Sequence, residues 1–484
     1  MELNQLLLNT KIISVHGDTN IDVKEICSDS RQVEPGFLFV AVAGICTDGH
    51  DYISKAIEKG ATVVVYDKAM IEEYFSRVTY IQVEDSAKAL AEIAAAWYDY
   101  PSTELQLVGI TGTNGKTTVA TLLYNTVRKL GFAAGLLSTV CNYVNDEAYP
   151  TTLTTLDAIS LNKYLRKMVD AGCEYAFMEV SSHAIHQQRT HFLEFVGGVF
   201  TNLTQDHLDY HKNMLDYLNV KKQFFDNLPK SAFALTNVDD KNGRVMLQNT
   251  KASQYTYSVK KLGDYKARIF EKHFDGTDIE INDKELTVQF VGVFNVYNLL
   301  AVYGTALLLG LPADEVLVTL SALQPVAGRF QTIRSSNDVT AIVDYAHTPD
   351  ALINVLEAIH QVLNNKGEII TVVGCGGNRD KTKRPIMARE SVERSDRVIL
   401  TSDNPRFEEP QDILNDMLTG LTHQQQQQTI NILDRREAIK TAINLAKPGD
   451  VVLIAGKGHE TYQDVKGVKH HFDDSEVVGE CFEV

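Results

Sequence analysis

The sequence predicts an α/β protein of three domains, with a mostly parallel sheet in the central one. At 484 residues the chain is too long for one hydrophobic core, because domains of about 150 residues are usual. Short apolar runs alternate with segments of helical period, as expected when helices cover both faces of parallel strands. A Gly-rich turn at residues 111–118 joins a strand to a helix, an arrangement typical of ligand sites in such sheets.

The first predicted domain, residues 1–98, is a small α/β unit. Strands are predicted at 36–44 and 61–66, and helices at 54–59 and 87–98. The turn at 28–36 is rich in hydroxyl side chains and, taken alone, is an ordinary capped turn. Tyr100-Pro101 marks the domain boundary, because the residue before a proline rarely continues a helix.

The second predicted domain, residues 99–328, contains the Gly-rich turn TGTNGKTT. Backbone amides at a helix start attract anions, a lysine can reach terminal phosphates, and a threonine hydroxyl can hold Mg²⁺. The sequence therefore predicts a P-loop ATPase domain. Its ATP-binding loop comprises Gly112, Thr113, Asn114, Gly115, Lys116, Thr117 and Thr118. The general P-loop pattern asks for glycine where Ile110 stands, so the match is to a shorter variety of loop.

Polar side chains follow the later strands of this domain, where parallel sheets bind ligands. Glu179 closes one strand and His207 follows another, and both are candidate Mg²⁺ ligands, although magnesium prefers oxygen. Lys221 and Lys222 lie in a predicted helix at 215–228, and spacing alone favours a solvated helix face for both. Asn295 and Asn298 open a later helix, where capping is favoured over contact with a base edge. Antiparallel strands are expected at the domain edge, within 251–291.

The third predicted domain, residues 329–484, is Rossmann-like. Strands are predicted at 340–347, 368–377, 397–406 and 450–460. Their polar and Gly-rich ends are expected at one edge of the sheet, but no complete dinucleotide fingerprint is present, which argues against NAD. The tract from Gln424 to Gln428 is predicted to be an exposed, dispensable loop.

Composition excludes several classes of function. The net charge of −17 argues against nucleic-acid binding, because no basic surface is available to neutralise phosphates. The six cysteines are scattered without a CxxC pair, which favours reduced thiols over disulfides or zinc. Neither a signal peptide nor a membrane-spanning apolar run is recognisable, so a cytoplasmic protein is expected.

Eight motifs, spread over nearly the whole chain in one order, resemble those of the Mur ligase family of peptidoglycan synthesis. They are TGTNGKTT, EVSSHAIHQQR, DHLDYH, the Asn295/Asn298 pair, DYAHTPD, GCGGNRDKTKRP, DNPR and AGKGHE. The resemblance is greatest to the members that add diaminopimelate as the third residue of the peptide. It implies a UDP-binding N-terminal domain, a central ATPase and a C-terminal amino-acid-binding domain.

The resemblance also implies roles for individual residues. Positions that contact the UDP-sugar and muramyl dipeptide correspond to Ser28, Ser30, Ile45, Cys46, Thr47, Thr154, Thr155, Ser181, Gln187 and Arg189; Leu153 departs from the asparagine common in relatives. Diaminopimelate contacts correspond to Arg379, Asp403, Asn404, Pro405, Arg406, Gly456 and Glu460. Lys221 corresponds to a lysine carbamylated by CO₂, which would hold a second Mg²⁺ with Glu179 and His207. Asn295 and Asn298 would face adenine, and Asp344 and His347 would reach the nucleotide when the domains close.

The implied reaction is ATP-dependent ligation of meso-diaminopimelate to the D-Glu γ-carboxylate of UDP-MurNAc-L-Ala-D-Glu through an acyl phosphate. Lys116, Lys221, His207 and Glu179 are the implied catalytic residues, and the small-molecule substrates and Mg²⁺ the implied partners of a monomer. Arg406 favours diaminopimelate, because its planar fork suits the extra carboxylate that lysine lacks. The alternatives are the same ligase using L-lysine, a folylpolyglutamate synthetase-like ligase, and a nucleotide-dependent switch without ligase chemistry.

Overall fold

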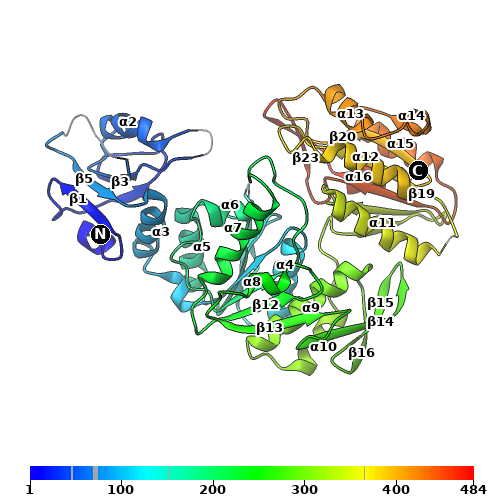
Figure 1. Ribbon diagram of the computed structural model, residues 1–484, viewed down its shortest axis with the longest axis horizontal. Helices are drawn as coiled ribbons and strands as arrows, with labels where there is room; N and C mark the ends of the chain where they lie inside the picture. The colour runs from blue at the N-terminus through cyan, green and yellow to red at the C-terminus, as the bar shows by residue number, and fades with distance from the viewer. Residues whose placement is uncertain (45–46, 69–74, 152, 365, 484) are drawn as a thin grey trace.

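The structure, a computed structural model, describes residues 1–44, 47–68, 75–151, 153–364 and 366–483. Three bodies follow one another in chain order, from the blue N-terminal body to the yellow and red C-terminal body (Figure 1). Each contains one main sheet, and these sheets lie within residues 1–98, 99–328 and 329–484, which we propose as the domain boundaries. No described helix is both long and apolar enough to cross a bilayer.

The N-terminal sheet has the strand order β1-β5-β4-β3-β2, with β1 antiparallel and the other strands parallel. Its strands are β1 (Ile12–His16), β2 (Glu25–Cys27), β3 (Phe37–Val40), β4 (Val63–Tyr66) and β5 (Thr79–Val83). Its helices are α1 (Leu3–Leu6), η1 (Gly49–Tyr52), α2 (Ile53–Glu58) and α3 (Ser86–Trp97), and η2 (Pro101–Glu104) leads into the next body. The Asp85 carboxylate caps helix α3. The alanine-rich face of α3 packs on the sheet.

The central sheet has eleven strands in the order β16-β15-β14-β13-β12-β11-β6-β10-β7-β8-β9. Its strands are β6 (Gln106–Thr111), β7 (Ala134–Leu137), β8 (Asn142–Val144), β9 (Glu147–Tyr149), β10 (Tyr175–Glu179), β11 (Gly197–Phe200), β12 (Phe233–Asn237), β13 (Ser253–Ser258), β14 (Tyr265–His273), β15 (Gly276–Ile281) and β16 (Lys284–Val288). Pairing is parallel from β14 through to β7. The antiparallel strands predicted within 251–291 are confirmed as β14, β15 and β16.

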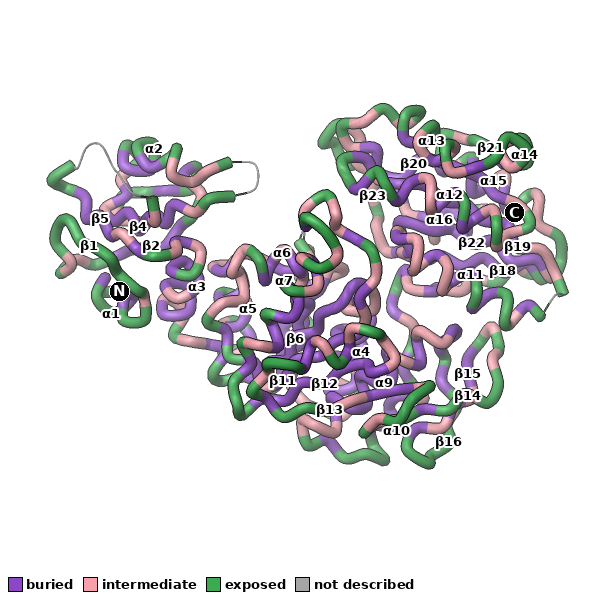
Figure 2. Tube along the Cα trace, in the orientation of Figure 1, coloured by how far each residue is buried: buried purple, intermediate pink, exposed green. Residues whose placement is uncertain are grey.

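Helices cover both faces of the central sheet, as the alternation of strands and helices predicted. Val108 and Ile110 of β6 face a core shared with α4 (Lys116–Lys129), α9 (Val293–Leu308) and α10 (Ala313–Ser321). Leu107 faces the opposite core, shared with α5 (Ala158–Asp170), α6 (Ser182–His186), α7 (Met214–Asp226) and α8 (Gly243–Met246). Figure 2 shows β6, at the middle of this sheet, as a buried strand. Burial of both faces explains why the parallel strands read as continuous apolar runs.

The C-terminal sheet has the order β17-β18-β22-β19-β20-β21, parallel except for β17. Its strands are β17 (Gln331–Arg334), β18 (Thr340–Asp344), β19 (Ile369–Cys375), β20 (Arg397–Ser402), β21 (Thr429–Asn431) and β22 (Val451–Ala455), and a separate hairpin comprises β23 (Tyr462–Val465) and β24 (Val468–His471). One face is covered by α11 (Pro349–Leu363), α12 (Lys383–Arg394) and α13 (Pro410–Leu418), the other by α15 (Arg435–Leu445) and α16 (Asp474–Phe482). The four predicted strands, which are β18, β19, β20 and β22, are parallel neighbours and thus end at one edge, as expected.

The prediction of a loop at the glutamine tract is wrong, because these residues form helix α14 (His423–Gln428). Thr422 and Gln425 form a capping box, in which each side chain bonds the backbone of the other. Gln426 donates to the carbonyls of Leu418 and Leu421. The side chains are exposed or half-buried, but local capping makes the segment helical.

Candidate active site

The phosphate loop lies between β6 and α4, as predicted. Gly112 (φ +150°) and Gly115 (φ +86°) adopt backbone conformations that favour glycine. The Lys116 ammonium folds over the loop and donates to the carbonyls of Gly112 at 3.0 Å and Thr113 at 2.8 Å. Desolvation lowers the pKa of Lys116. The loop therefore presents backbone amides, one lysine and the hydroxyls that begin α4 to a common point.

Replacing Gly112 by alanine is expected to weaken ATP binding by at least about tenfold, because the added Cβ would lie 1.9 Å from Thr201 Oγ1. Gly131→Ala is the matched control, since Gly131 also has a positive φ (+93°) but nothing lies within 4 Å of the place that its added methyl would occupy. Titration with a fluorescent ATP analogue compares the two variants. Equal affinities would contradict the role assigned to the loop.

A cleft of ≈ 1270 Å³ lies between the central and C-terminal bodies. It brings together residues that are hundreds of positions apart in the chain. The predicted site residues that line it are Thr113, Asn114, Gly115, Lys116, Thr117, Thr118, Thr154, Thr155, Glu179, Ser181, Gln187, Arg189, His207, Lys221, Asn295, Asn298, Asp344, His347, Arg379, Asp403, Asn404, Arg406, Gly456 and Glu460. Of the predicted residues, Gly112 and Pro405 do not line the cleft.

The predicted UDP-sugar contacts lie apart from this cleft, in the N-terminal body. Ser30 is buried, whereas Ser28 and Thr47 are exposed. Ile45 and Cys46 lie outside the described residues. The Asp48 carboxylate beside this segment accepts from His50 Nδ1 at 2.6 Å, and His50 Nε2 lies 3.0 Å from Asp67. The loop that bears Thr47 is thus anchored to the end of β4.

Lys221 is buried, and the solvated position favoured by its spacing is wrong. Its side chain is 1% exposed because α7 packs against the core beneath β6, and its Nζ donates to the Gly112 carbonyl at 2.8 Å. Burial and the nearby Lys116 ammonium hold the pKa of Lys221 well below its ordinary value, against the opposing charge of Asp206. Lys222 is also buried, and pairs with Asp226 at 2.6 Å instead of facing solvent.

Glu179 is fixed at the end of β10 by its neighbours. Its Oε1 accepts from the backbone amide of Thr139 at 2.7 Å and from the Thr139 hydroxyl at 2.9 Å. Thr155 donates to the Glu179 carbonyl at 2.8 Å. A second oxygen donor, the Thr117 hydroxyl, lines the same cleft. Both are oxygen donors, the ligand type that magnesium prefers.

Asp206 links the central and C-terminal bodies. Its Oδ2 lies 3.4 Å from His207 Nε2 and 3.8 Å from His347 Nε2, and its Oδ1 lies 3.9 Å from Lys383 Nζ. Burial would raise the pKa of Asp206, but these three groups outweigh it and hold the pKa below its usual range. Burial lowers the pKa of His207 to about 3 and of His347 to about 4. Both imidazoles are therefore neutral at neutral pH.

Arg329 joins the phosphate loop to the C-terminal body, although sequence reasoning missed it. Its Nη2 donates to the Thr117 hydroxyl at 3.1 Å, and its guanidinium carbon lies 4.4 Å from the centre of the Tyr345 ring. Asp344 nearby accepts from the Phe330 amide at 2.6 Å, and burial raises the pKa of Asp344 to about 6. A positive charge thus reaches the loop from a segment with no motif of its own.

Other cleft residues were also missed, because only the fold brings them to the site. Asp350 at the start of α11 accepts from Asn114 Nδ2 at 3.0 Å, across the two bodies. The capping role favoured for Asn295 and Asn298 is wrong, because the N-cap of α9 is Gly292 and no side chain caps it. Instead, Asn295 Nδ2 donates to the Val291 carbonyl, and Asn298 Nδ2 to Asn295 Oδ1. Asn298 also faces the phosphate loop, since its Oδ1 would lie 2.5 Å from a Cβ at Gly115.

The predicted muramyl-dipeptide residues form one hydrogen-bonded group. Arg189 donates to Gln187 Oε1 at 3.0 Å and 2.6 Å and to the Thr155 carbonyl at 2.8 Å. The Thr155 hydroxyl is 3.2 Å from that of Ser181, which caps α6. Thr154 is 3.1 Å from the Thr139 hydroxyl and so connects this group to Glu179.

The predicted diaminopimelate residues converge at the carboxyl edge of the C-terminal sheet. Arg406 Nη1 donates to the Gly377 carbonyl at 2.8 Å, which directs the guanidinium into the cleft also lined by Arg379. Asn404 Nδ2 donates to Glu460 Oε2 at 2.7 Å. Burial and the neighbouring Asp403 raise the pKa of Glu460, against hydrogen bonds that lower it. Cationic and anionic subsites therefore lie side by side.

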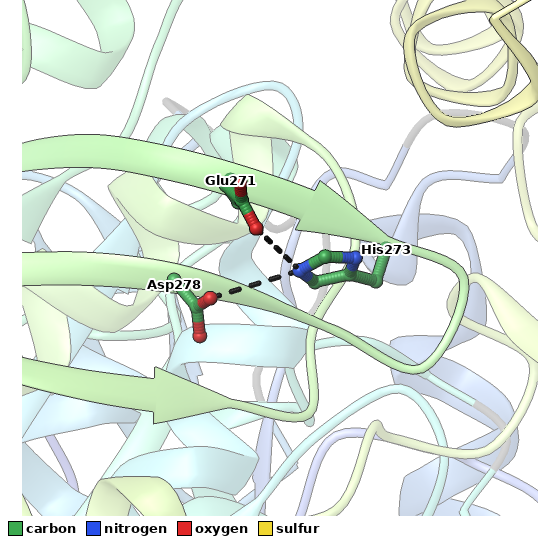
Figure 3. A group of neighbouring side chains, drawn as sticks. All are labelled: Glu271, His273 and Asp278. Atoms are coloured by element: carbon green, nitrogen blue, oxygen red, sulfur yellow. Dashed lines mark ion pairs between the residues drawn. The ribbon is translucent and has the colours of Figure 1, made fainter.

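A further group of metal-ligand type lies away from the cleft. On the β14–β15 hairpin, His273 Nε2 is 3.5 Å from Glu271 and 3.6 Å from Asp278 (Figure 3). The three side chains are on a solvent-exposed surface, and none lines the cleft. These distances are those of surface ion pairs, which contribute little to stability.

The fold and the cleft define a class: a three-domain α/β protein whose phosphate loop opens into a cleft lined by both the central and the C-terminal bodies. Residues 22–98 match the Mur ligase family catalytic domain, residues 110–306 the Mur ligase middle domain, and residues 328–458 the Mur ligase glutamate ligase domain. The chain belongs to the Mur ligase family.

Relatives of known name match over their full length. A protein of Bacteroides fragilis named UDP-N-acetylmuramoyl-L-alanyl-D-glutamate–2,6-diaminopimelate ligase is 59% identical over 482 residues, which cover 100% of this chain and 99% of that one. A protein of Cytophaga hutchinsonii with the same name is 53% identical over 483 residues, covering 100% and 99%. A solved structure of a ligase of that name has a TM-score of 0.68 at 30% identity and covers 100% of this chain and 99% of its own.

Proposed function

We propose that the protein is an ATP-dependent ligase that adds meso-2,6-diaminopimelate to the D-Glu γ-carboxylate of UDP-MurNAc-L-Ala-D-Glu. One observation carries the proposal: a single cleft joins the phosphate loop to a site where Arg406 and Glu460 offer opposite charges to an amino acid. The names of the full-length relatives support the same reaction. The product would serve peptidoglycan synthesis, and hence cell-wall biogenesis, cell shape, and division during the cell cycle.

In the proposed first step, an oxygen of the D-Glu carboxylate attacks the γ-phosphorus of ATP, forming an acyl phosphate and releasing ADP. Both reactants are anions, so the site must align them and neutralise charge. Lys116, which contacts the Gly112 carbonyl, and Arg329, which donates to the Thr117 hydroxyl, would supply positive charge at the phosphate loop. The asparagines Asn295 and Asn298 would orient the nucleotide, with Asp344 and His347 closing over it.

The magnesium ions expected of this family would be held by residues already in place. Thr117 and Glu179 suit one ion, and Glu179, His207 and a carbamylated Lys221 would suit a second. When bound, Mg²⁺ neutralises phosphate charge. The protonated Lys221 offers only N–H donors, but burial lowers its pKa and so favours the neutral amine, whose nitrogen would attack CO₂ and then lose a proton. The resulting carbamate is an oxygen ligand.

In the second step, the amine of diaminopimelate attacks the acyl carbonyl carbon, the C–O bond to phosphate breaks, and an amide forms. Arg406 and Arg379 would bind carboxylates of the amino acid, and Glu460 an ammonium group. The ion pair of Asp206 in the central body with Lys383 in the C-terminal body, at 3.9 Å, would help to hold the two bodies together. A closed cleft excludes water, which would otherwise hydrolyse the acyl phosphate.

We further propose that the enzyme acts in the cytoplasm as a monomer on small-molecule substrates. Its substrates are anionic nucleotides, and its own net charge of −17 makes local cations necessary at each binding position. Ser28, Ser30, Ile45, Cys46 and Thr47 would hold the UDP-sugar end, and the group around Arg189 the dipeptide end.

The test is release of ADP by purified full-length protein with Mg²⁺, measured while each substrate is omitted in turn. We expect ADP release only when ATP, UDP-MurNAc-L-Ala-D-Glu and meso-diaminopimelate are all present, with one ADP per amide formed. ATP turnover at the same rate without either of the other two substrates would contradict ligase chemistry and favour a nucleotide-dependent switch.

A further inference from the structure

A fully buried lysine stands behind the amino-acid part of the cleft. Lys457 is 0% exposed and follows β22 in the segment that carries Glu460. Its Nζ donates to Asn404 Oδ1 at 3.2 Å, to Glu460 Oε2 at 3.0 Å and to the Tyr462 carbonyl. An ammonium has three donors, and all three are used. Lys457 does not line the cleft and therefore acts on its neighbours, not on a ligand.

The contacts of Lys457 fix which way the Asn404 side chain points. Asn404 Oδ1 accepts from Lys457 Nζ and also from the Asp464 backbone amide at 2.9 Å. Because two N–H donors face this position, it must be the oxygen of the amide. The NH₂ group is consequently directed at Glu460, to which it donates at 2.7 Å.

The same contacts fix the Glu460 carboxylate. Within the described part of the chain, both side-chain donors, Lys457 and Asn404, end on Oε2. Oε1 is left to the cleft, which Glu460 lines. Lys457 also connects three segments: the loop after β20, the loop after β22 and the start of the β23–β24 hairpin.

We propose that Lys457 is the positioning residue of the amino-acid site, which it sets by aligning Asn404 and Glu460 so that Glu460 Oε1 receives an ammonium group of the acceptor. This inference rests on the proposed function, because it needs an amino-acid acceptor. It assigns Lys457 no contact with the substrate. Its effect is confined to one substrate, whereas ATP and the UDP-sugar bind elsewhere in the site.

Charge adds to the geometric role. Glu460 lies beside Asp403, and burial with this second carboxylate raises the pKa of Glu460, while Lys457 and Asn404 lower it. Without Lys457 the pKa of Glu460 would rise further, and the protonated acid could not pair with an ammonium. The titratable or charged groups around it are Asp403, Lys457, Tyr345, Tyr462 and Arg435.

The decisive variant is Lys457→Met in the full-length protein, with Lys222→Met as a matched control. Lys222 is also buried and ion-paired, but with Asp226 on α7. We expect Lys457→Met to reduce kcat/KM for diaminopimelate by about 30-fold or more, since two charge-assisted contacts to the site are lost. The KM values for ATP and for the UDP-sugar should stay within about twofold of wild type. KM values that rise equally for diaminopimelate, ATP and the UDP-sugar would overturn the proposal.

The pH profile separates positioning from general damage. The acid limb of the pH profile of kcat/KM for diaminopimelate should move to higher pH in Lys457→Met, because the pKa of Glu460 is higher without Lys457. A reduced rate with an unmoved acid limb would contradict the assignment. The control Lys222→Met should keep the wild-type profile.

A double-mutant cycle tests the route of action even if the single variant does not fold. Lys457→Met/Glu460→Gln removes both charges together, which leaves no unpaired buried ion. If Lys457 acts through Glu460, the double variant should match Glu460→Gln within about twofold. If the double variant instead lost much more kcat/KM than Glu460→Gln alone, Lys457 would act by a route that does not pass through Glu460. Acceptor-dependent ADP release by the wild type is measured first, so that failure of the proposed function is recognised separately.

Discussion

Replacing Lys221 by methionine is expected to lower amide formation by about 10³-fold or more, because fixed charge at a phosphoryl-transfer site contributes on this scale. Lys221 is 1% exposed and reaches the Gly112 carbonyl, so methionine fills a similar volume but offers no amine for CO₂. Initial rates of ADP release measure the loss. Lys222→Met, one position away and paired with Asp226, is the control and should retain most activity.

The same variant tests carbamylation directly. Intact-protein mass under native conditions should show one added CO₂ in the wild type and none in Lys221→Met. Wild-type activity should fall in CO₂-depleted buffer and return with bicarbonate. Full activity in CO₂-depleted buffer, with no added mass, would show that Lys221 acts as a free amine and would remove the second proposed magnesium site.

Replacing Arg406 by alanine is expected to reduce kcat/KM for diaminopimelate by about 10³- to 10⁴-fold, because the distal carboxylate would enter a site without its cation. The KM for ATP should not change, since Arg406 follows β20 of the C-terminal sheet and its Nη1 donates to the Gly377 carbonyl, whereas the phosphate loop belongs to the central body. Steady-state kinetics with each substrate varied in turn provides the measurement. Arg334→Ala, at an exposed position on β17, is the control.

A second substitution separates charge from shape at this position. Arg406→Lys keeps the charge but loses the planar fork that binds a carboxylate through two parallel hydrogen bonds. We expect it to recover only part of the lost activity. Arg406 has a positive φ of 52°, but arginine, lysine and alanine all carry a Cβ, so this backbone strain is common to the three and the comparison isolates the side-chain effect. Wild-type kinetics in Arg406→Ala would show that another residue selects the acceptor.

Elements with strong local signals were predictable from the sequence. The apolar run before Gly112 and the helix after Gly115 are found as β6 and α4, because a buried parallel strand and a capped helix each have a distinctive pattern. The carboxyl ends of β18, β19, β20 and β22 meet as expected, since neighbouring parallel strands share one edge. The polar residues that follow these strands were therefore placed correctly.

Features that depend on tertiary packing were not predictable. The burial of Lys221 arises because α7 packs beneath β6, and helical spacing alone indicated solvent. Arg329 reaches the phosphate loop from 212 residues away, with no local pattern to mark it. Asp350 reaches it from 236 residues away and ends the DYAHTPD motif, but the sequence did not indicate this contact. The glutamine helix α14 was missed because its capping box lies in a low-complexity tract. In each case the position of the residue depends on contacts that the local sequence pattern does not indicate.

The most direct test of the account is the mass of the product when meso-diaminopimelate and L-lysine compete at equal concentration. Wild-type protein with ATP, Mg²⁺ and UDP-MurNAc-L-Ala-D-Glu should give the diaminopimelate tripeptide almost alone, because only diaminopimelate supplies a second, distal carboxylate to Arg406. A product containing mainly lysine would agree with the proposed ligase activity but contradict the role of Arg406 in the choice of acceptor. The absence of any amide product would contradict the proposed function itself.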